Sequence, residues 1–350
     1  MTKILNTISE YEQFVVYGAQ VVAYGAYTAI RHLCNKVPEC FVVSSFLNNP
    51  VEIDGIPVRM LDTVSKDALI IVGVTELLQQ EINATLQKKG YQHIINLTQH
   101  EEHLLMSAYF ESIGKFPLLL RGKSGESEEL ALYEVKSYCD KPLMYPPNLQ
   151  SFEYSIQAGA ALTEDHIASI LDHTGYSISH KNKQYCEMSA TYWVWKNTDH
   201  QWKGIEHYRR HLCVKPEMLS EAVDVVLPLP YICYPNTMSQ FGRFVTPAVS
   251  ELLLKALKDL HPQEFETYNK ILYGQYQYTY NLVCARKEVF HAYCEWFFEI
   301  TEYMEIFAEQ VPEIANTRAL SYVAEVLTNL YFMYYQDRLK IFHVEKEIYI

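Results

Sequence analysis

The first hundred residues alternate short apolar runs with longer helical runs, and this alternation constrains the fold more than any other feature of the chain. The run FVVY (14–17) leads into a glycine-bearing turn and an apolar helical run. Further apolar runs are CFVVSS (40–45), ALIIVGV (68–74) and HIIN (93–96). Strands that alternate with helices predict a parallel sheet in a doubly wound α/β unit.

The turn after the first strand is where such a unit would bind a dinucleotide. In the fingerprint G-x-G-x-x-G, the second glycine lets the backbone approach a pyrophosphate. Here Gln20 stands at that position, and Ser44 and Ser45 stand where an acidic residue should end the second strand. We therefore expect an accessory domain with a degenerate site, and an NAD-linked enzyme is the alternative. The stretch resembles the small N-terminal domain that precedes many bacterial surface-polysaccharide enzymes, which implies a scaffold or sensor role.

Charge and hydropathy exclude several classes of partner. The chain has 350 residues and a formal net charge of −13, so it gains no general electrostatic attraction to nucleic acids or anionic bilayers, and we expect no nucleic-acid partner. No apolar run reaches the roughly 18–20 residues of a membrane span, and the polar N-terminus does not predict a signal peptide. The eight cysteines form no C-x-x-C pair. We expect reduced thiols and a cytoplasmic protein, with room for peripheral contact at the inner face of the membrane.

The composition changes near the end of the first unit, which gives the expected domain boundaries. We predict an accessory domain over residues 1–112, a linker over 113–130 and a second domain over 131–350. The linker contains RGKSGESEE (121–129), which is polar and glycine- and serine-rich and predicts an exposed connection. It is no P-loop, because the leading glycine is missing. ALYEVKSY (131–138) then alternates apolar and polar residues, as a strand does.

The densest chemistry lies in residues 185–212, YCEMSATYWVWKNTDHQWKGIEHYRRHL. Glu187, Thr191 and Trp195 follow at helical spacing on one face. A strand then begins near residue 202 and ends in His-Tyr-Arg-Arg. Ligands of open α/β sheets bind at the carboxyl ends of strands, so this end predicts a site for a charged ligand. The alternative is a structural ion pair.

Strand alternation predicts which of these side chains share a face. Glu206, Tyr208 and Arg210 should lie on one face of the strand, and His207 and Arg209 on the other. Polar residues that lead into the stretch can donate to phosphate or hydroxyl oxygens. With them, the candidate donor-binding residues are Tyr138, Lys141, Gln157, Gly159, Lys181, Asn182, Glu187, Lys196, Asn197, Glu206, His207, Tyr208, Arg209, Arg210 and Asn281.

The pattern ISHKN, YCEMSATYWVWKN and GIEHYRRHL resembles a family of bacterial capsular and exopolysaccharide glycosyltransferases, long catalogued as a conserved domain of unknown function. Later segments continue the resemblance, namely VDVVLP (223–228), YNLVCA (280–285), YCEWFF (293–298), and Arg318 with Glu325. It covers about residues 131–350. It implies a GT-A-like domain with a mixed, mostly parallel central sheet, which follows a small Rossmann-like domain. It also implies hexosyl transfer from a nucleotide sugar, and it favours UDP-linked galactose or galactofuranose as the donor.

The sequence also departs from the family pattern. Cys139 and Asp140 replace the end of the first strand, His211 and Leu212 replace an aromatic pair, and Glu206 replaces a small or thiol residue. We find no Asp-x-Asp in the second domain, so no metal ligand is assigned, although Mn²⁺ or Mg²⁺ stays open. We expect Arg209 and Arg210, with Lys141 or Lys196, to stabilise the leaving diphosphate instead.

Three carboxylates are candidates for the catalytic base, namely Asp224, Glu295 and Glu325. Residues 231–243 predict a loop that acts as a lid.

The expected acceptor is a growing bacterial surface glycan, lipid-linked or not, or a glycoprotein. The alternative function is a non-catalytic partner that binds a nucleotide sugar or carbohydrate within a polysaccharide assembly complex.

Overall fold

The computed structural model describes residues 3–119 and 129–350, and it divides the chain into two compact units. The first unit is Met1–Pro117 with Tyr231–Pro235, and the second is Leu118–Pro230 with Asn236–Ile350. Of the expected connection over residues 121–129, all but Glu129 lies outside the described residues. Each unit has its own sheet and is taken separately.

The first unit is a six-stranded sheet in the order β3-β4-β2-β1-β5-β6, parallel except for the β3–β4 pair. Its strands are fully apolar at the centre, because helices cover a parallel sheet on both faces. The elements are α1 (Lys3–Glu10), β1 (Phe14–Tyr17), α2 (Val21–Cys34), β2 (Phe41–Val43), β3 (Glu52–Ile53), β4 (Ile56–Met60), β5 (Leu69–Val72), α3 (Glu76–Lys88), β6 (Ile94–Asn96), α4 (Gln99–Ser112) and β13 (Tyr231–Ile232).

The turn between β1 and α2 is closed by protein atoms. Gly18 has φ +114°, and a Cβ there would meet the carbonyl oxygen of Gly73 at 2.7 Å. Gln20, the residue in place of the fingerprint glycine, precedes α2 and donates from Nε2 to Asn49 Oδ1 at 2.7 Å. The glutamine side chain therefore ties this turn to a neighbouring loop of the same unit.

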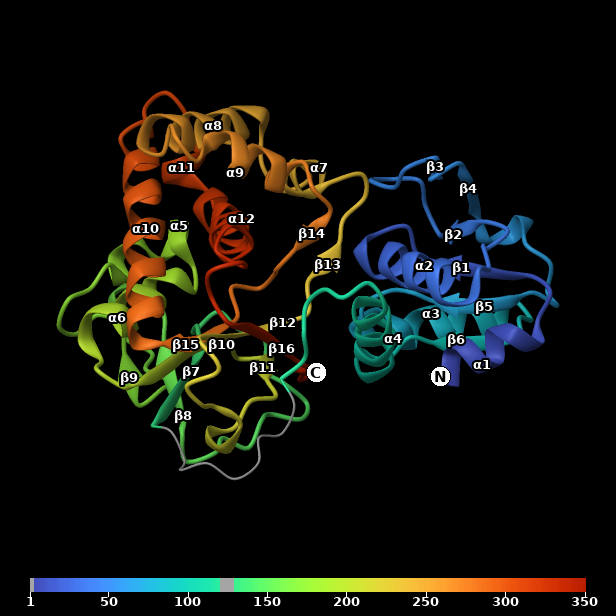
Figure 1. Ribbon diagram of the computed structural model, residues 1–350, viewed down its shortest axis with the longest axis horizontal. Helices are drawn as coiled ribbons and strands as arrows, with labels where there is room; N and C mark the ends of the chain where they lie inside the picture. Colours follow the sequence, from blue (N-terminus) through green and yellow to red (C-terminus); the bar gives the residue numbers. More distant parts are fainter. Residues whose placement is uncertain (1–2, 120–128) are drawn as a thin grey trace. The chain divides into compact units, whose positions relative to one another are not determined.

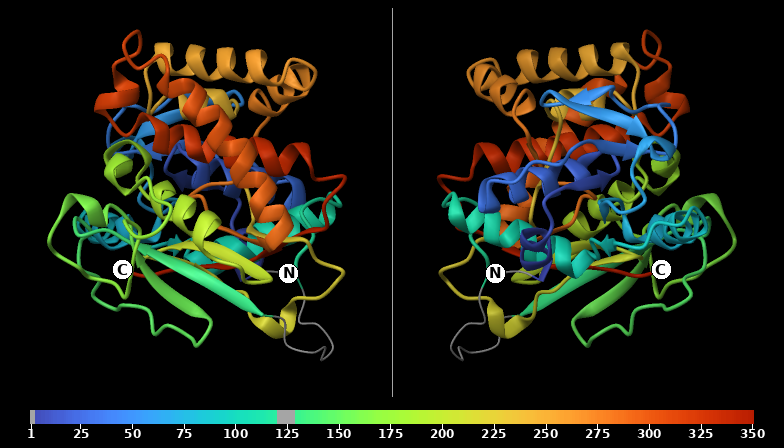
Figure 2. Two further views of the ribbon diagram at one scale, coloured as in Figure 1. Left: turned by 90° about the vertical axis from the view of Figure 1, so that its left-hand side faces the viewer. Right: turned by 90° about the vertical axis from the view of Figure 1, so that its right-hand side faces the viewer.

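The second unit is built on a mixed sheet in the order β16-β12-β15-β10-β7-β8-β9, with β11 paired to β10 and β17 paired to β11. The strands of this sheet are β7 (Leu130–Lys136), β8 (Glu153–Gln157), β9 (Ile170–Leu171), β10 (Trp202–His207), β11 (Arg210–Leu212), β12 (Val225–Pro228), β15 (Val283–Arg286), β16 (Ile341–Val344) and β17 (Lys346–Ile348). The unit also contains the short strand β14 (Tyr276–Gln277), which is not part of this sheet. The run from β10 through β7 and β8 to β9 is parallel, and Figure 2 shows the long strands β7 and β8 side by side. This is the mixed, mostly parallel sheet of a GT-A-like fold.

Helices of the second unit gather on one side of this sheet (Figure 1). They are α5 (Asn182–Tyr185), α6 (Met188–Asn197), α7 (Thr237–Phe241), α8 (Pro247–Leu260), α9 (Phe265–Leu272), α10 (Lys287–Glu305), α11 (Glu313–Asn316) and α12 (Ala319–Tyr334). The aromatic helix α10 packs on β10 and β15, where Lys203 lies over the ring of Phe290. None of the described helices is both long enough and apolar enough to cross a membrane.

The opposite face of the sheet is an apolar core. Trp202 is fully buried there among Leu132, Cys284 and Val226. The register of β10 on β7 pairs Glu206 with Glu134 and His207 with Val135. This register decides which polar side chains meet on each face of the sheet.

Two elements differ from the sequence-based expectation. The predicted loop over residues 231–243 contains β13 and the helix α7, because Asn236 caps that helix with a bond from Ser239 N–H to its Oδ1 at 2.8 Å. The C-terminal run LKIFHVEKEIYI (339–350) predicts one closing strand, and the structure has two strands there, β16 and β17. They have different partners, since β16 lies parallel to β12 and β17 antiparallel to β11.

Candidate functional site

A cavity of about 350 Å³ opens at the carboxyl ends of β7, β8 and β10. It is lined by residues 135–140, Ala158, Leu162, Asn182, Lys183, Cys186, Glu187, His207 and Arg318. Because β7, β8 and β10 are parallel, their ends meet at one edge of the sheet, as in other α/β proteins that bind ligands there. We call this hollow the Glu187 cavity.

Glu187 is held at the cavity wall by a chain of hydrogen bonds from three elements. Asn281 donates from Nδ2 to Glu187 Oε1 at 2.8 Å, and Thr328 donates to Asn281 Oδ1 at 2.9 Å. Burial raises the pKa of Glu187 above its usual range, although the bond from Asn281 and the charges of Arg318 and Arg210 oppose the rise. The carboxyl group is therefore positioned and less acidic than a free glutamate.

Glu325 of α12 is electrostatically coupled to Glu187. Burial, and then the charge of Glu187, raises the pKa of Glu325 to about 7, against the backbone N–H of Tyr280 and the charges of Arg210 and Arg318. Two carboxyl groups that influence each other in this way tend to share one proton near neutral pH. We refer to them as the Glu187–Glu325 pair.

Three residues beside this pair have left-handed backbone conformations without being glycine. Cys186 has φ 48°, Tyr280 has φ 69° and Asn281 has φ 53°. Such conformations are costly for residues with a Cβ and gather at sites where geometry matters. Cys186 directly precedes Glu187, and Asn281 is the residue that donates to it. These constrained backbone conformations therefore hold the carboxylate and the amide in place.

The His-Tyr-Arg-Arg segment is a hairpin turn. The expectation that it continues one strand is wrong, because β10 ends at His207 and β11 begins at Arg210, and these two residues pair across the turn. Opposite residues of an antiparallel pair share a face. Arg210 therefore lies on the side of His207, with its Nη1 at 3.5 Å from the histidine Nδ1, while Tyr208 and Arg209 form the turn.

Both arginines keep donors available. The Nε atoms of Arg209 and Arg210 are buried and have no hydrogen-bond partner among the described residues. Their guanidinium groups lie near aromatic rings, Arg210 at 4.0 Å from the ring centre of Tyr280 and Arg209 at 4.6 Å from that of Tyr208. Burial and these charges lower the pKa of His207 to about 3, so the imidazole is neutral. Fixed cationic donors of this kind suit an anionic ligand.

Several predicted donor-binding residues hold the scaffold of the cavity. Gln157 bonds through its amide to the backbone of Asp165 and Ile167. Asn182 donates to Cys186 O at 2.7 Å and to Ser189 Oγ at 2.9 Å. Asn197 bonds to both backbone groups of Tyr176. These amides fix loops, and of the three only Asn182 also lines the cavity.

A buried carboxylate that the sequence analysis missed organises the same loops. Asp172 accepts from the N–H groups of Gly159 and Ala160 at 3.0 Å each and from the hydroxyl of Ser189 at 2.7 Å. Gly159 has φ +72°, and a Cβ there would meet Asn182 Oδ1 at 2.5 Å. Glycine at this position is therefore needed for the close approach of the two loops. No motif in the sequence marks Asp172.

The predicted lysines lie in three different environments. Lys181 forms an ion pair with Glu305 at 2.7 Å, and Lys196 lies at 3.3 Å over the ring of Trp195. Lys141 lines a neighbouring hollow of about 250 Å³ with Tyr138, which also lines the Glu187 cavity. Lys136 lines both hollows and was not predicted, although its place at the end of β7 could have identified it.

The three predicted base residues lie in different places. Asp224 pairs with Arg286 at 3.7 Å and accepts from the N–H of Lys340, away from the cavity lining. Glu295 is exposed on α10. Only Glu325 joins Glu187 in the charged group beside the cavity.

Glu206, predicted to bind the donor, lies on the other face of β10. It is fully buried and close to Glu153 and His211. Among the described residues, these three form the one group of histidine, cysteine and acidic side chains whose ligand atoms converge as at a metal site. Within the described part of the chain, the carboxylates of the Glu187 cavity are not part of such a group.

Comparisons with known proteins agree with this architecture. The model of a family described as a domain of unknown function, DUF4422, matches residues 141–337, more than half of the chain. A solved structure titled as the apo form of the WbbM bifunctional glycosyltransferase matches with a TM-score of 0.55 and 23 % identity. The match covers 63 % of this chain and 45 % of that one, so it spans less than half of that protein. No curated protein sequence matches the chain.

Proposed function

The chain belongs to the DUF4422 family, and we propose that its second unit transfers a sugar from a nucleotide-sugar donor to an acceptor hydroxyl in the Glu187 cavity. One observation carries the proposal. Glu187 lines the cavity at the strand ends, and residues from distant segments interact with it there. These residues are Arg210, Asn281 and Glu325, the last of which lies 138 residues further along the chain (325 − 187). The shared fold with a structure titled as a glycosyltransferase supports it.

The transfer needs one bond to break and one to form. The bond between the sugar C1 and the donor diphosphate breaks, and its electron pair leaves with the diphosphate. The acceptor oxygen bonds to C1 and loses its proton to a base. The Glu187–Glu325 pair is the proton acceptor, with Glu187 as the member that lines the cavity, because burial raises the pKa of both carboxyl groups toward the range in which they exchange protons at neutral pH.

The leaving diphosphate needs positive charge that is already in place. Arg318 lines the cavity, and Arg209 and Arg210 follow the neutral His207 that also lines it. Guanidinium groups bind phosphate oxygens through two parallel bonds, which a point charge cannot do. We assign to these arginines the charge stabilisation that a divalent ion supplies in other such enzymes.

The family resemblance supplies the finer assignment. It favours a UDP-linked hexose, galactose or galactofuranose, and a bacterial surface glycan, lipid-linked glycan or glycoprotein as acceptor. The sugar transfer would then take place in the cytoplasm, at the inner face of the membrane for a lipid-linked acceptor. We extend the proposal to these partners on that basis alone.

The first experiment is a thermal-shift screen against nucleotides and nucleotide sugars, followed by a product assay with the sugar that shifts the protein. Stabilisation scales as RT ln(1 + [L]/Kd), about 2.7 kcal/mol at a hundredfold excess over Kd. A selective shift by one nucleotide sugar, with release of its nucleotide during turnover, would establish the transferase. Binding without release or transfer would support the alternative, a non-catalytic binding partner. No shift by any nucleotide would refute both.

A further inference from the structure

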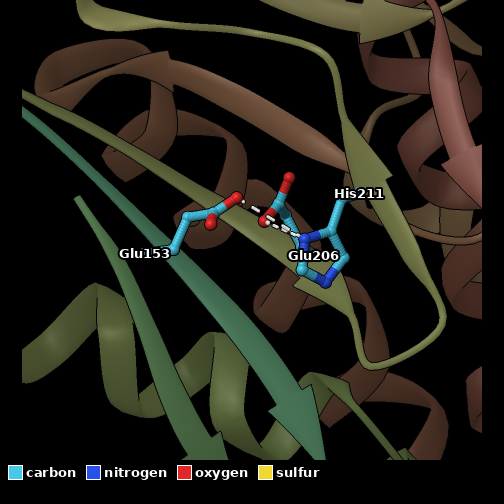
Figure 3. Close-up of side chains that lie close together, drawn as sticks. All are labelled: Glu153, Glu206 and His211. Atoms are coloured by element: carbon cyan, nitrogen blue, oxygen red, sulfur yellow. Dashed lines mark ion pairs between the residues drawn. The ribbon is translucent and has the colours of Figure 1, made fainter. Parts of the chain in front are cut away.

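Glu153, Glu206 and His211 point toward one another from three different strands, β8, β10 and β11 (Figure 3). His211 Nδ1 lies 3.5 Å from Glu153 Oε1 and 3.5 Å from Glu206 Oε2. One ligand atom from each residue lies within 4.8 Å of the other two. We call this group the His211 cluster.

The cluster is buried and incompletely bonded. Glu206 is 0 % exposed and His211 is 4 % exposed. Glu206 Oε2, which faces the imidazole, and His211 Nε2 have no hydrogen-bond partner among the described residues. Buried polar atoms without partners are costly, and two neighbouring buried carboxylates also repel each other. A protonated His211 offsets this repulsion through its ion pairs with Glu153 and Glu206. A metal ion bound between the two carboxylates and His211 Nδ1 would offset it as well, and would also give Glu206 Oε2 a ligand bond.

We infer that the His211 cluster binds a divalent transition-metal ion, and zinc fits it best. Zinc bound to histidine nitrogen and carboxylate oxygen at about 2.0–2.1 Å in a tetrahedron places neighbouring ligand atoms roughly 3.3–3.4 Å apart. The distances of 3.5 Å from His211 Nδ1 to Glu153 Oε1 and to Glu206 Oε2 are close to this value. One imidazole and two carboxylates leave a fourth position for water.

A third carboxylate, that of Glu134, lies near the other ring nitrogen of the histidine, as in known zinc sites. Glu134 Oε1 lies 3.8 Å from His211 Nε2, on the side of the ring away from Glu153 and Glu206. Glu134 is itself fixed by the hydroxyl of Ser155 at 2.6 Å and by Lys136 Nζ at 2.9 Å. Metal-bound histidines usually direct their other ring nitrogen at such a carboxylate, which sets the tautomer. In this arrangement Nδ1 is the metal-binding atom.

The cluster is separate from the Glu187 cavity. Glu206 and His207 are consecutive on β10, so their side chains lie on opposite faces of the sheet. His207 lines the cavity, and Glu206 belongs to the cluster. The two ligands Glu206 and His211 flank the turn that carries Tyr208 and Arg209, so a bound ion would fix both ends of that turn. The inference does not depend on the proposed function.

Zinc binding to chelator-treated full-length protein tests the inference. We expect one zinc per chain in competition with a chromogenic chelator and a higher Tm with zinc. His211→Phe should abolish this binding, and Glu153→Gln, a milder change at a residue nearer the surface, should weaken it at least tenfold. His180→Phe, which removes an exposed histidine of the same unit, should leave it unchanged.

Circular dichroism establishes that each variant is folded before its zinc affinity is compared. X-ray absorption at the zinc edge should show nitrogen and oxygen ligands only. The inference is overturned if the wild-type chain binds no zinc at one equivalent. It is equally overturned if folded Glu153→Gln binds zinc as tightly as the wild type, or if the spectrum shows sulfur ligands.

Discussion

Asn281 donates a hydrogen bond to Glu187 across 94 residues of sequence, and both residues stand next to or within strained backbone. Asn281 is almost fully buried, and its carbonyl oxygen accepts from Thr328 at 2.9 Å. Each end of this amide therefore has one partner, which fixes its orientation. Through these two bonds, Asn281 links Glu187 in the cavity wall to Thr328 of α12.

Replacing Asn281 with alanine should change both acidity and stability. Without the donor, the pKa of Glu187 rises further, because the bond from Asn281 is the largest effect that lowers it. We expect the acid limb of the transfer rate to move to higher pH, and about 1–3 kcal/mol of unfolding free energy to be lost through the unpaired groups. A pH–rate profile and urea unfolding measure the two effects. The exposed Asn148→Ala should change neither.

The raised pKa of Glu325 predicts that the free energy of unfolding depends on pH. Its pKa in the folded protein is about 7, above the ordinary 4.5, so the folded state holds a proton that the unfolded state releases. The stabilisation from this proton is present below about pH 4.5 and is lost as the pH rises through 7. Glu325→Gln should match the wild type at pH 4 and be more stable at pH 8, on the order of 2–3 kcal/mol. Urea unfolding at both pH values decides it, and equal stabilities at pH 8 would contradict the raised pKa. Exposed Glu309→Gln is the control.

The same substitution should shift the pH dependence of transfer. The charge of Glu187 raises the pKa of Glu325, so the ionisation near pH 7 belongs to Glu325, and a glutamine there removes that ionisation. The change in transfer rate near pH 7 should therefore be lost in Glu325→Gln, provided that the pair accepts the proton. An unchanged midpoint would remove Glu325 from the mechanism.

Replacing a cavity arginine with alanine should lower the affinity for the nucleotide-sugar donor, and replacing it with lysine should not restore that affinity. We expect Arg210→Ala and Arg318→Ala each to weaken nucleotide-sugar binding about 10- to 100-fold, as is typical for loss of a charge-assisted contact of 1.5–3 kcal/mol. Arg210→Lys should recover little, because an ammonium group cannot form the paired bonds. Calorimetric titration measures the affinities. Exposed Arg338→Ala should bind normally. If EDTA and Arg209→Ala both leave transfer unimpaired, the arginine account is wrong.

Replacing Gly159 with alanine should lower the stability of the fold through a steric clash. Gly90→Ala is the control that measures the cost of the backbone conformation alone. Gly159→Ala forces a Cβ to 2.5 Å from Asn182 Oδ1 at φ +72°. Gly90→Ala has a similar φ of +85° but nothing within 4 Å of its Cβ. Gly90→Ala should cost about 1–2 kcal/mol, the price of the left-handed conformation alone. Gly159→Ala should cost clearly more and should also lower donor affinity. Thermal unfolding of both variants makes the comparison.

Much of the architecture was predictable from the sequence, because local patterns carry it. Strand periodicity predicted β1, β2, β5 and β6 of the first sheet but not β3 and β4. The resemblance predicted the GT-A-like second sheet that the structure has. The turn at Tyr208 and Arg209 was not predictable from alternation, because the pairing of His207 with Arg210 depends on where β11 finds its second partner, β17. The roles of the site residues remain predictions.

What the sequence could not reveal are groups that only the register brings together. Glu153 and His211 are 58 residues apart (211 − 153), and no spacing rule joins them. Asp172 lies in a stretch without motif character, yet it accepts hydrogen bonds from Gly159, Ala160 and Ser189. The two departures from the family pattern, Glu206 and His211, were visible in the sequence. Their meeting in space was not, because it depends on the pairing of β10 with β11.

The opposite orientation of Glu206 and His207 limits how this chain can vary in length. A single residue inserted or deleted within β10 would exchange the two faces of the strand, so that the carboxylate would enter the cavity and the imidazole would meet the acidic groups behind it. Substitutions change one site at a time, whereas a length change here would disrupt both at once. Natural relatives and engineered versions of this domain should therefore tolerate insertions in their loops but not between Trp202 and His207.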